Sequence, residues 1–200
     1  MRIGLYGGSF DPPHRGHLSA ARHFVRELSL DRLIVMPTFL SPAKSERKGT
    51  SPVDRLAMTR LAFADFSGCP VTVSDDEIRR GGRSFTLDTL KRLAKEGVEC
   101  PYLLCGTDML LSFDRWRGTE EILKLSIPAV MPRAEEDRDV LKRQIALLRE
   151  RYGGEIVLLD GAPVPLSSTE VREKVRAGLP TGDDLSESVR AYITEKGLYR

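Results

Sequence analysis

Residues 7–17 read GGSFDPPHRGH, and they stand between two different hydrophobic patterns. The short apolar run from Ile3 to Tyr6 before them predicts a strand, and Gly7 and Gly8 predict the turn that ends it. After this stretch, apolar residues recur every three or four positions as far as Leu28, which predicts a helix. A strand, a glycine turn and a helix in this order begin an α/β fold. Residues 7–17 therefore decide the expected fold class.

The remainder of the chain repeats this alternation. Apolar runs predict further buried strands near residues 33–36, 71–73, 102–105, 128–131 and 156–159. Helical patterns begin at Ser51 and Ser167 and cover residues near 86–96, 107–124, 135–151 and 189–196. We therefore predict a Rossmann-like, doubly wound α/β fold: a mainly parallel sheet with helices on both faces and a small C-terminal helical part. Residues 1–200 are expected to form a single domain, in which about 165–200 could be a helical subdomain.

Composition and charge narrow the class of protein. Hydrophobic residues make up 40% of the 200 positions and charged residues 30%, which is typical of a soluble globular protein. A net charge of +2 gives no reason to expect a nucleic-acid partner. Neither a membrane-spanning run nor a signal peptide is visible, and three cysteines without a CxxC pair favour a cytoplasmic location. The sequence leaves a homo-oligomer open.

The turn and the helix start within residues 7–17 suit a phosphate. Gly7 and Gly8 let the backbone approach an anion closely, and a helix N-terminus supplies free N–H groups and a positive dipole end. His14 and His17 can face one ligand and stabilise charge that grows in a transition state. The alternatives are half of a metal site or a pair of helix caps. Because His23 is the only other histidine and no cysteine pair is near, we expect no protein-bound metal.

A second polar cluster occupies residues 166–172, which read LSSTEVR. The hydroxyls of Ser167, Ser168 and Thr169 crowd a predicted helix start. Arg172 lies in the first turn of that helix, where its planar fork of donors could hold phosphate oxygens. The alternative is an ordinary capping box beside a surface arginine.

Both clusters resemble motifs of the nucleotidyltransferase superfamily. Residues 14–17 resemble its (T/H)xGH motif, and residues 167–172 resemble its ISSTxxR motif. Residues 84–90, residues 106–122 and residues 192–200 resemble, more narrowly, segments of the bacterial nicotinate-nucleotide adenylyltransferase family. The resemblance covers nearly the whole length. It implies a cytoplasmic enzyme of NAD biosynthesis that transfers the adenylyl group of ATP to nicotinate mononucleotide, giving deamido-NAD and pyrophosphate.

Two other functions stay open. A related adenylyltransferase could use nicotinamide mononucleotide or pantetheine phosphate as its acceptor, and a non-catalytic protein could sense nucleotides. The resemblance also implies that Mg²⁺ arrives with the ATP phosphates and keeps most of its waters, so that few protein ligands are needed.

The resemblance implies a role for each matching residue. Those implied to act in catalysis are His14, His17 and Arg172. Those implied to bind ATP are Gly7, Gly8, Ser9, Phe10, His14, His17, Lys44, Gly106, Asp108, Ser167, Ser168, Thr169 and Arg172. Those implied to bind nicotinate mononucleotide are Ser9, Lys44, Ser84, Phe85, Thr86, Trp116, Arg117 and Arg133.

Three of these residues have a plain structural alternative. The Trp116 ring could stack on a pyridine ring, or it could fill the core. Asp108 could accept hydrogen bonds from a ribose, or it could be an acid at a helix start. Thr86 could contact the pyridine carboxylate, or it could cap a helix.

Three stretches depart from the family pattern. Residues 41–44 read SPAK where the family usually has PPHK, so Ala43 replaces a histidine while Lys44 remains. Phe85 replaces a tyrosine and lacks its hydroxyl, and residues 132–134 match an arginine-proline-glycine turn only in part, which leaves the role of Arg133 open. We expect the loss at Ala43 to place more of the phosphate binding on the two histidines and Lys44.

Overall fold

The structure is a computed structural model that describes residues 1–42, 49–161 and 163–200. Within these ranges, parallel strands form one six-stranded sheet in the order β3-β2-β1-β4-β5-β6. The strands are β1 (Ile3–Gly8), β2 (Arg32–Pro37), β3 (Val71–Val73), β4 (Tyr102–Gly106), β5 (Ile127–Met131) and β6 (Val157–Leu158). The strand order reverses between β1 and β4. The carboxyl ends of the strands beside that reversal are where doubly wound sheets bind ligands.

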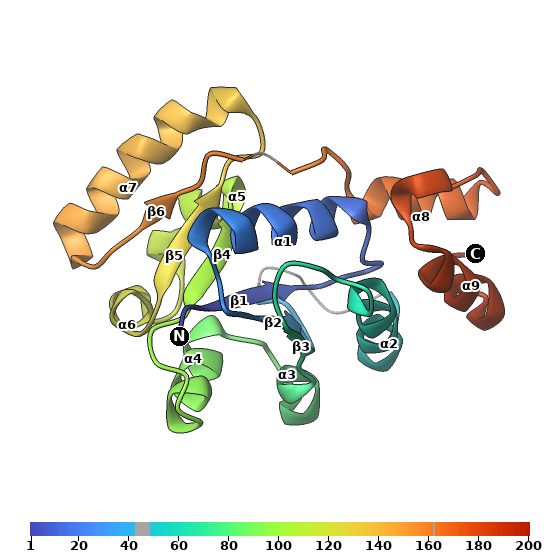
Figure 1. Cartoon of the computed structure of the whole chain (residues 1–200), viewed down its shortest axis with the longest axis horizontal. Helices are drawn as coiled ribbons and strands as arrows, with labels where there is room; N and C mark the ends of the chain where they lie inside the picture. The colour runs from blue at the N-terminus through green and yellow to red at the C-terminus, as the bar shows by residue number, and fades with distance from the viewer. Residues whose placement is uncertain (43–48, 162) are drawn as a thin grey trace.

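Helices cover both faces of this sheet (Figure 1). They are α1 (Arg15–Leu28), α2 (Pro52–Phe63), α3 (Asp76–Arg80), α4 (Thr86–Lys95), α5 (Thr107–Leu111), α6 (Thr119–Leu125), α7 (Arg138–Tyr152), α8 (Ser168–Arg176) and α9 (Glu187–Lys196). Three short 3-10 turns are η1 (Phe113–Arg115), η2 (Glu135–Asp137) and η3 (Gly182–Asp184). The predicted doubly wound α/β fold is confirmed. None of the helices in the described ranges has both the length and the apolar character needed to cross a membrane.

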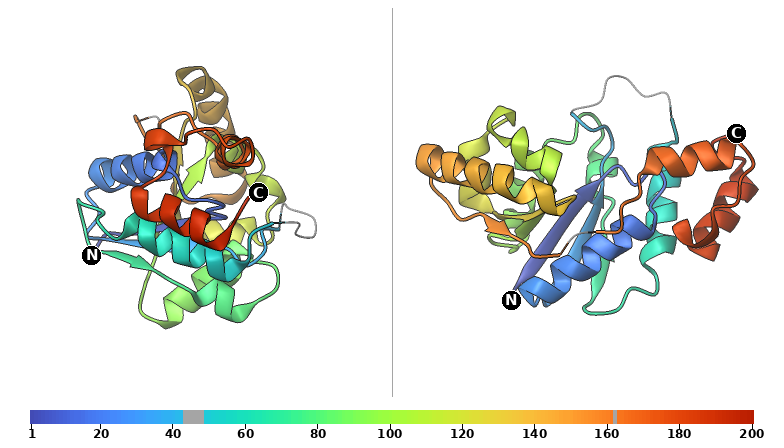
Figure 2. Two further views of the ribbon diagram at one scale, coloured as in Figure 1. Left: turned by 90° about the vertical axis from the view of Figure 1, so that its right-hand side faces the viewer. Right: turned by 90° about the horizontal axis from the view of Figure 1, so that it is seen from above.

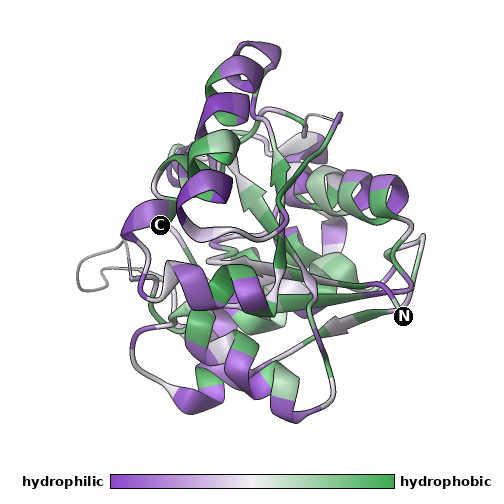
Figure 3. Cartoon of the chain, turned by 90° about the vertical axis from the view of Figure 1, so that its left-hand side faces the viewer, coloured by the Kyte–Doolittle hydropathy of each residue, from purple (hydrophilic) through white to green (hydrophobic). Residues whose placement is uncertain are grey.

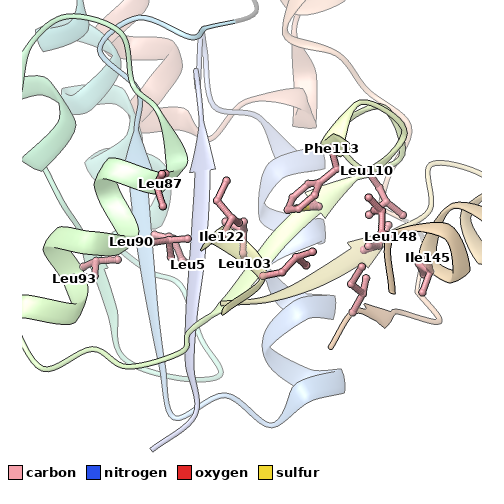
Figure 4. Packing of buried hydrophobic residues seen from close by; sticks show 14 of the residues in the cluster. Leu5, Leu87, Leu90, Leu93, Leu103, Leu110, Phe113, Ile122, Ile145 and Leu148 are labelled. Atoms are coloured by element: carbon pink, nitrogen blue, oxygen red, sulfur yellow. The ribbon is translucent and has the colours of Figure 1, made fainter. Parts of the chain in front are cut away.

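Side chains that alternate along the strands build a core on each face of the sheet. In β2, Leu33 and Val35 belong to the core beneath α1, whereas Ile34 and Met36 belong to the core beneath α4, α6 and α7. This is the period-two pattern of a strand buried on both faces. Figure 4 shows the second of these cores, with leucines of α4 close to Leu5 of β1. In Figure 3 the strands are mainly hydrophobic, and the surrounding helices carry hydrophilic residues on their outer sides.

A third core joins the helices after residue 165 to α2. Met58 of α2, Val171 of α8 and Val189 of α9 are completely buried together. Figure 2 shows α8 and α9 at one end of the molecule, beside α2. The predicted C-terminal helical part is therefore present, and its apolar faces pack against a helix that begins just after the 43–48 segment.

One predicted helix is wrong: residues 107–124 form α5, η1 and α6 instead of a continuous helix. Gly118 adopts a left-handed conformation with φ +75°, and a Cβ atom there would lie 2.4 Å from a Leu87 methyl carbon. The Ser112 hydroxyl donates to the Asp108 carbonyl at 2.8 Å, a side-chain bond that competes with helix continuation. As a result, Trp116 has an extended backbone between η1 and α6.

Candidate active site

His14 and His17 form a pair at the start of α1. His14 is the N-cap residue, and its Nδ1 accepts a hydrogen bond from the Gly16 N–H at 3.1 Å. The His14 N–H in turn donates to Nδ1 of His17 at 3.2 Å, and the ring centroids are 3.8 Å apart. A Cβ atom at Gly16 would lie 3.0 Å from both the His14 ring and the Val164 carbonyl oxygen. The glycine of this motif therefore makes room for the histidine.

The same hydrogen bonds fix the tautomer of both rings. Since each Nδ1 accepts a backbone N–H, the ring proton of each neutral imidazole is on Nε2. Burial lowers the pKa of His14 to about 4, against the opposing charges of Asp184 and Glu170. Burial and the neighbouring His14 also hold the pKa of His17 well below its ordinary value. At neutral pH the site thus presents two uncharged Nε2–H donors, and neither has a protein acceptor among the described residues.

These pKa values predict how stability depends on pH. The unfolded chain takes up a proton at His14 below about pH 6.5, whereas the folded protein does so only near pH 4. The free energy of unfolding should therefore fall as the pH drops from about 6.5 to 4, by about 3 kcal/mol for His14 alone. Urea unfolding of the wild type and of His14→Asn across this range measures the difference. A His14 imidazole that titrates near 6.5 by NMR in the folded protein would contradict it.

The second polar cluster lies directly against the first. The Ser168 hydroxyl donates to the Pro12 carbonyl at 3.0 Å, and Nη1 of Arg172 donates to the Asp11 carbonyl at 2.7 Å. The Thr169 hydroxyl accepts a hydrogen bond from Nη2 of Arg172 at 3.1 Å. Residues 11–12 and 168–172, far apart in the sequence, therefore form one unit at the start of α1 and α8.

Ser167 caps α8 as the sequence suggests. Its hydroxyl accepts from the Glu170 N–H at 3.2 Å and donates to Oε2 of Glu170 at 2.7 Å, and Oε2 also accepts from the Ser167 N–H at 2.7 Å. The capping box is thus present in full. Both the capping interpretation and the contact with the first motif hold for this cluster, and the hydroxyl of Ser167 is already occupied by the cap.

The residues between β1 and α1 are held by aromatic packing. Phe10 is 1% exposed, with its ring 5.0 Å from the His17 ring and 5.3 Å from the Tyr6 ring. A nucleotide could therefore reach Phe10 only through its backbone. Gly7 and Gly8 end β1 beside Met36 and Pro37 of β2, at the carboxyl edge of the sheet where Ser9 follows. The buried Phe10 side chain therefore supports the orientation of the His17 ring and does not contact a nucleotide.

Arg55 of α2 is a residue of this region that the sequence analysis did not single out. It is completely buried, and its guanidinium donates to the carbonyls of Ser9, Thr38 and Phe39. It thereby ties the segment after β1 to the segment after β2. An arginine in a helix is usually exposed, so the sequence carried no clear sign of this role.

A second group of predicted site residues surrounds the start of α4. The Arg117 guanidinium lies 4.8 Å from the Phe85 ring centroid, and Nη1 of Arg117 is 3.4 Å from Oδ2 of Asp88. This cation–π contact uses the face of the ring, so it does not need the hydroxyl that Phe85 lacks. Thr86 is the first residue of α4, while Phe85 occupies the N-cap position without a side-chain cap. Thr86 is therefore not the helix cap.

Trp116 is half-buried in the same region. Its ring centroid lies 4.8 Å from that of Phe113, and Nε1 is 3.4 Å from the Ser112 hydroxyl. The side chain packs against the core without being enclosed by it. Core packing is thus part of its role. Part of the ring is exposed, so its stacking on a pyridine ring stays a prediction.

Ser84 is buried, and its hydroxyl and N–H both form hydrogen bonds within the protein. Its hydroxyl accepts from the Phe39 N–H at 3.0 Å, while its N–H donates to the Leu40 carbonyl. Burial raises the pKa of Glu77, whose Oε1 also accepts from the Thr89 hydroxyl at 2.6 Å. The predicted substrate contact of Ser84 would have to come from its backbone.

Asp108 and Arg133 face each other across the ends of β4 and β5. Nη2 of Arg133 is 2.6 Å from Oδ2 of Asp108, and both side chains are largely exposed. Gly106 is the N-cap residue of α5, and Asp108 lies in its first turn, as expected for an acid at a helix start. Asp108 was expected to bind ATP and Arg133 to bind nicotinate mononucleotide, whereas the two side chains pair with each other.

Ala43 and Lys44 lie outside the described residues, so the predicted phosphate contacts of Lys44 stay a prediction. Within the ranges that the structure does describe, no three histidine, cysteine or carboxylate side chains gather in a way that could hold a metal ion. His23, the third histidine, contacts Arg26 and Glu27 on its own helix.

Comparisons with known proteins agree on one family. The cytidylyltransferase-like family matches residues 5–174. A protein of Roseiflexus sp. (strain RS-1) named "Probable nicotinate-nucleotide adenylyltransferase" is 40% identical over 99% of this chain and 98% of its own length. A protein of the same name from Desulfitobacterium hafniense (strain Y51) is 39% identical over 100% of this chain and 96% of its own length. The chain belongs to the nicotinate-nucleotide adenylyltransferases of the cytidylyltransferase-like family.

Solved structures support the fold of this nicotinate-nucleotide adenylyltransferase family member. The nicotinic acid mononucleotide adenylyltransferase of Plasmodium falciparum complexed with NaAD superposes with a TM-score of 0.76 at 18% identity, covering 99% of this chain and 97% of that one. The same Plasmodium protein complexed with APC gives a TM-score of 0.74 at 16% identity, covering 99% and 96%. The stretch that matches the cytidylyltransferase-like family, residues 5–174, includes His14, His17 and Arg172.

Proposed function

We propose that this protein transfers the adenylyl group of ATP to the phosphate of nicotinate mononucleotide. A phosphate oxygen of the mononucleotide attacks the α-phosphorus of ATP, the bond from that phosphorus to the bridging oxygen breaks, and pyrophosphate leaves. The product is the dinucleotide deamido-NAD. Family membership at 40% identity over nearly the full length supports this activity.

The observation that carries the proposal is the contact between the two polar clusters. Arg172 and Ser168 bond the carbonyls of residues 11 and 12, next to His14 and His17. Two neutral Nε2–H donors, a guanidinium and two helix N-termini then converge on one region. This arrangement suits a triphosphate whose charge shifts toward the leaving pyrophosphate, because preorganised donors stabilise that charge without reorganising.

No general base is required in this reaction. The attacking phosphate is already an anion, so catalysis consists of positioning and charge stabilisation. In this proposal the Nε2–H groups of His14 and His17 donate to oxygens of the α-phosphate and its bridge. Arg172, Lys44 and the backbone N–H of Ser168 hold the remaining phosphate oxygens, because the Ser168 hydroxyl already donates to Pro12. Magnesium enters as part of the substrate, bound to the triphosphate and keeping most of its waters.

The start of α4 supports an acid rather than an amide as the acceptor. Phe85 provides no side-chain cap for this ten-residue helix, so a ligand carboxylate could accept from its first-turn N–H groups. Arg117, stacked on Phe85, adds a positive charge at the same place. The amide of nicotinamide mononucleotide has one oxygen to offer and carries no charge. Trp116, half-buried nearby, could stack on the pyridine ring.

A substrate panel tests the proposal. Pyrophosphate release is measured with ATP and each of three acceptors: nicotinate mononucleotide, nicotinamide mononucleotide and pantetheine phosphate. We expect kcat/KM to be at least about tenfold higher for the acid than for the amide, since losing a charge-assisted hydrogen bond costs that much or more. Higher efficiency with pantetheine phosphate would indicate the related adenylyltransferase. ATP binding without pyrophosphate release in the presence of any of the three acceptors would indicate a nucleotide sensor.

The cellular location follows as a further part of the proposal. Cys69, Cys100 and Cys105 are all free thiols, which is compatible with a reducing cytoplasm.

A further inference from the structure

Asp11 accepts hydrogen bonds from two distant parts of the chain. Its carbonyl accepts from Arg172 at 2.7 Å, and Oδ1 of its carboxylate accepts from the Tyr199 hydroxyl at 2.8 Å. The next residue, Pro12, accepts from Ser168. Asp11, one of the two residues that attach α8 to the first motif, is thus also held by a side chain that follows α9.

Tyr199 reaches Asp11 from a fixed position. α9 ends at Gly197 in the left-handed conformation, and the Leu198 N–H bonds back to the Ile193 carbonyl at 3.0 Å. Leu198 and Tyr199 pack against the core that joins α2, α8 and α9. Tyr199 itself has φ +66°, a conformation that costs a non-glycine residue on the order of 1 kcal/mol and so persists only where surrounding contacts hold it.

The Tyr199 hydroxyl lies in a partly buried, polar environment. Burial and the neighbouring Asp11 carboxylate raise its pKa, whereas the Thr50 side chain and the charge of Arg172 lower it by less. The hydroxyl is therefore protonated at all ordinary pH values and is a permanent donor to Asp11. Without it, the Asp11 carboxylate would lose a partner within a partly buried site and would turn toward water.

We propose that Tyr199 is a positioning residue of the active site, and this inference rests on the proposed adenylyl transfer. By holding Asp11 three residues before His14, it sets the place of the two carbonyls that Arg172 and Ser168 bond. Tyr199 thus fixes the distance between the histidine pair and the arginine that together hold the triphosphate. The residue itself touches no reacting atom.

The chain contains a matched control for this role. Tyr192, on α9, donates to Oδ1 of Asp54 at 2.8 Å, the same hydrogen bond to the same kind of acceptor at the same distance. Asp54 lies in the first turn of α2 and is outside both motifs. Tyr199→Phe and Tyr192→Phe each remove one hydroxyl and leave the ring in the same core. A merely structural role predicts equal effects from the two variants.

Two measurements test the proposal. The first is pyrophosphate release with ATP and nicotinate mononucleotide. Tyr199→Phe should lower kcat about tenfold, because a misplacement below one ångström is costly in a preorganised site, and Tyr192→Phe should leave kcat within about twofold of wild type at a similar loss of Tm. Combined with Asp11→Ala, Tyr199→Phe should add no further loss, since both changes remove the same contact.

The second measurement needs no turnover. The Cε1–H resonances of His14 and His17 in the free protein should shift in Tyr199→Phe and not in Tyr192→Phe, with His23 as an internal reference. Equal effects of the two variants on either measurement would overturn the proposal. Wild-type protein that releases no pyrophosphate would instead reject the proposed function, and the histidine resonances would still decide whether Tyr199 positions the pair.

Discussion

His17→Ala is expected to lower kcat for adenylyl transfer by about 100-fold or more, the usual cost of removing one donor that stabilises transition-state charge. The variant loses the Nε2–H donor of His17. In the wild type, the bond from the His14 N–H to Nδ1 of His17 places the ring proton on Nε2. The variant also removes the ring beside Phe10. His17→Asn, which keeps a polar side chain at this position, separates the loss of the Nε2–H donor from the loss of packing.

His23→Ala is the matched control for this experiment. It removes an imidazole from the same helix, where the ring contacts Arg26 and Glu27 and lies beside Gly161. Turnover should stay within about twofold of wild type, as for a surface change away from the site. If His17→Ala keeps wild-type kcat while circular dichroism shows it folded, the assignment of the histidine pair to charge stabilisation is wrong.

Arg55→Met is expected to produce the largest loss of stability, on the order of 3 kcal/mol or more in the free energy of unfolding. The buried guanidinium satisfies the carbonyls of Ser9, Thr38 and Phe39, and methionine leaves these acceptors without it at about 1–3 kcal/mol for each one that water cannot reach. Lysine should rescue little, because an ammonium cannot reproduce the planar fork. Urea unfolding at neutral pH measures the loss.

Arg60→Met is the control on the same helix. The Arg60 side chain is 55% exposed, and its Nη2 lies 3.8 Å from Asp75, so an effect below about 1 kcal/mol is expected. A loss for Arg55→Met no greater than that for Arg60→Met would show that the buried arginine does not hold the segments after β1 and β2 together.

The fold was largely predictable because the central strands β1, β2, β4 and β5 carry runs of buried residues. Runs such as Leu33 to Met36 are continuous in apolar residues, and a parallel sheet with crossover helices leaves few topologies to choose from. The break in the 107–124 region escaped prediction because its cause is tertiary. Gly118 is needed where Leu87 of a different helix comes close, and no local pattern reports that contact.

The site was predictable where chemistry depends on local order and not where it depends on long-range contact. The spacing of His14 and His17 and the capping box at Ser167 are local, and both are present as expected. The buried roles of Arg55 and Ser84 arise from carbonyls and amides brought in by other segments. From the sequence alone, Arg55 is an ordinary helical arginine, and Ser84 was expected to bind nicotinate mononucleotide.

The bonds from Ser168 and Arg172 to residues 11–12 also bear on how the protein is made. Asp11 and Arg172 are 161 positions apart, so the histidines emerge from the ribosome long before the groups that complete the phosphate site. A polypeptide cut between Leu158 and Ser168 contains every strand of the sheet and still lacks half of the clamp. Chains that end before Arg172 would therefore be poor at consuming ATP.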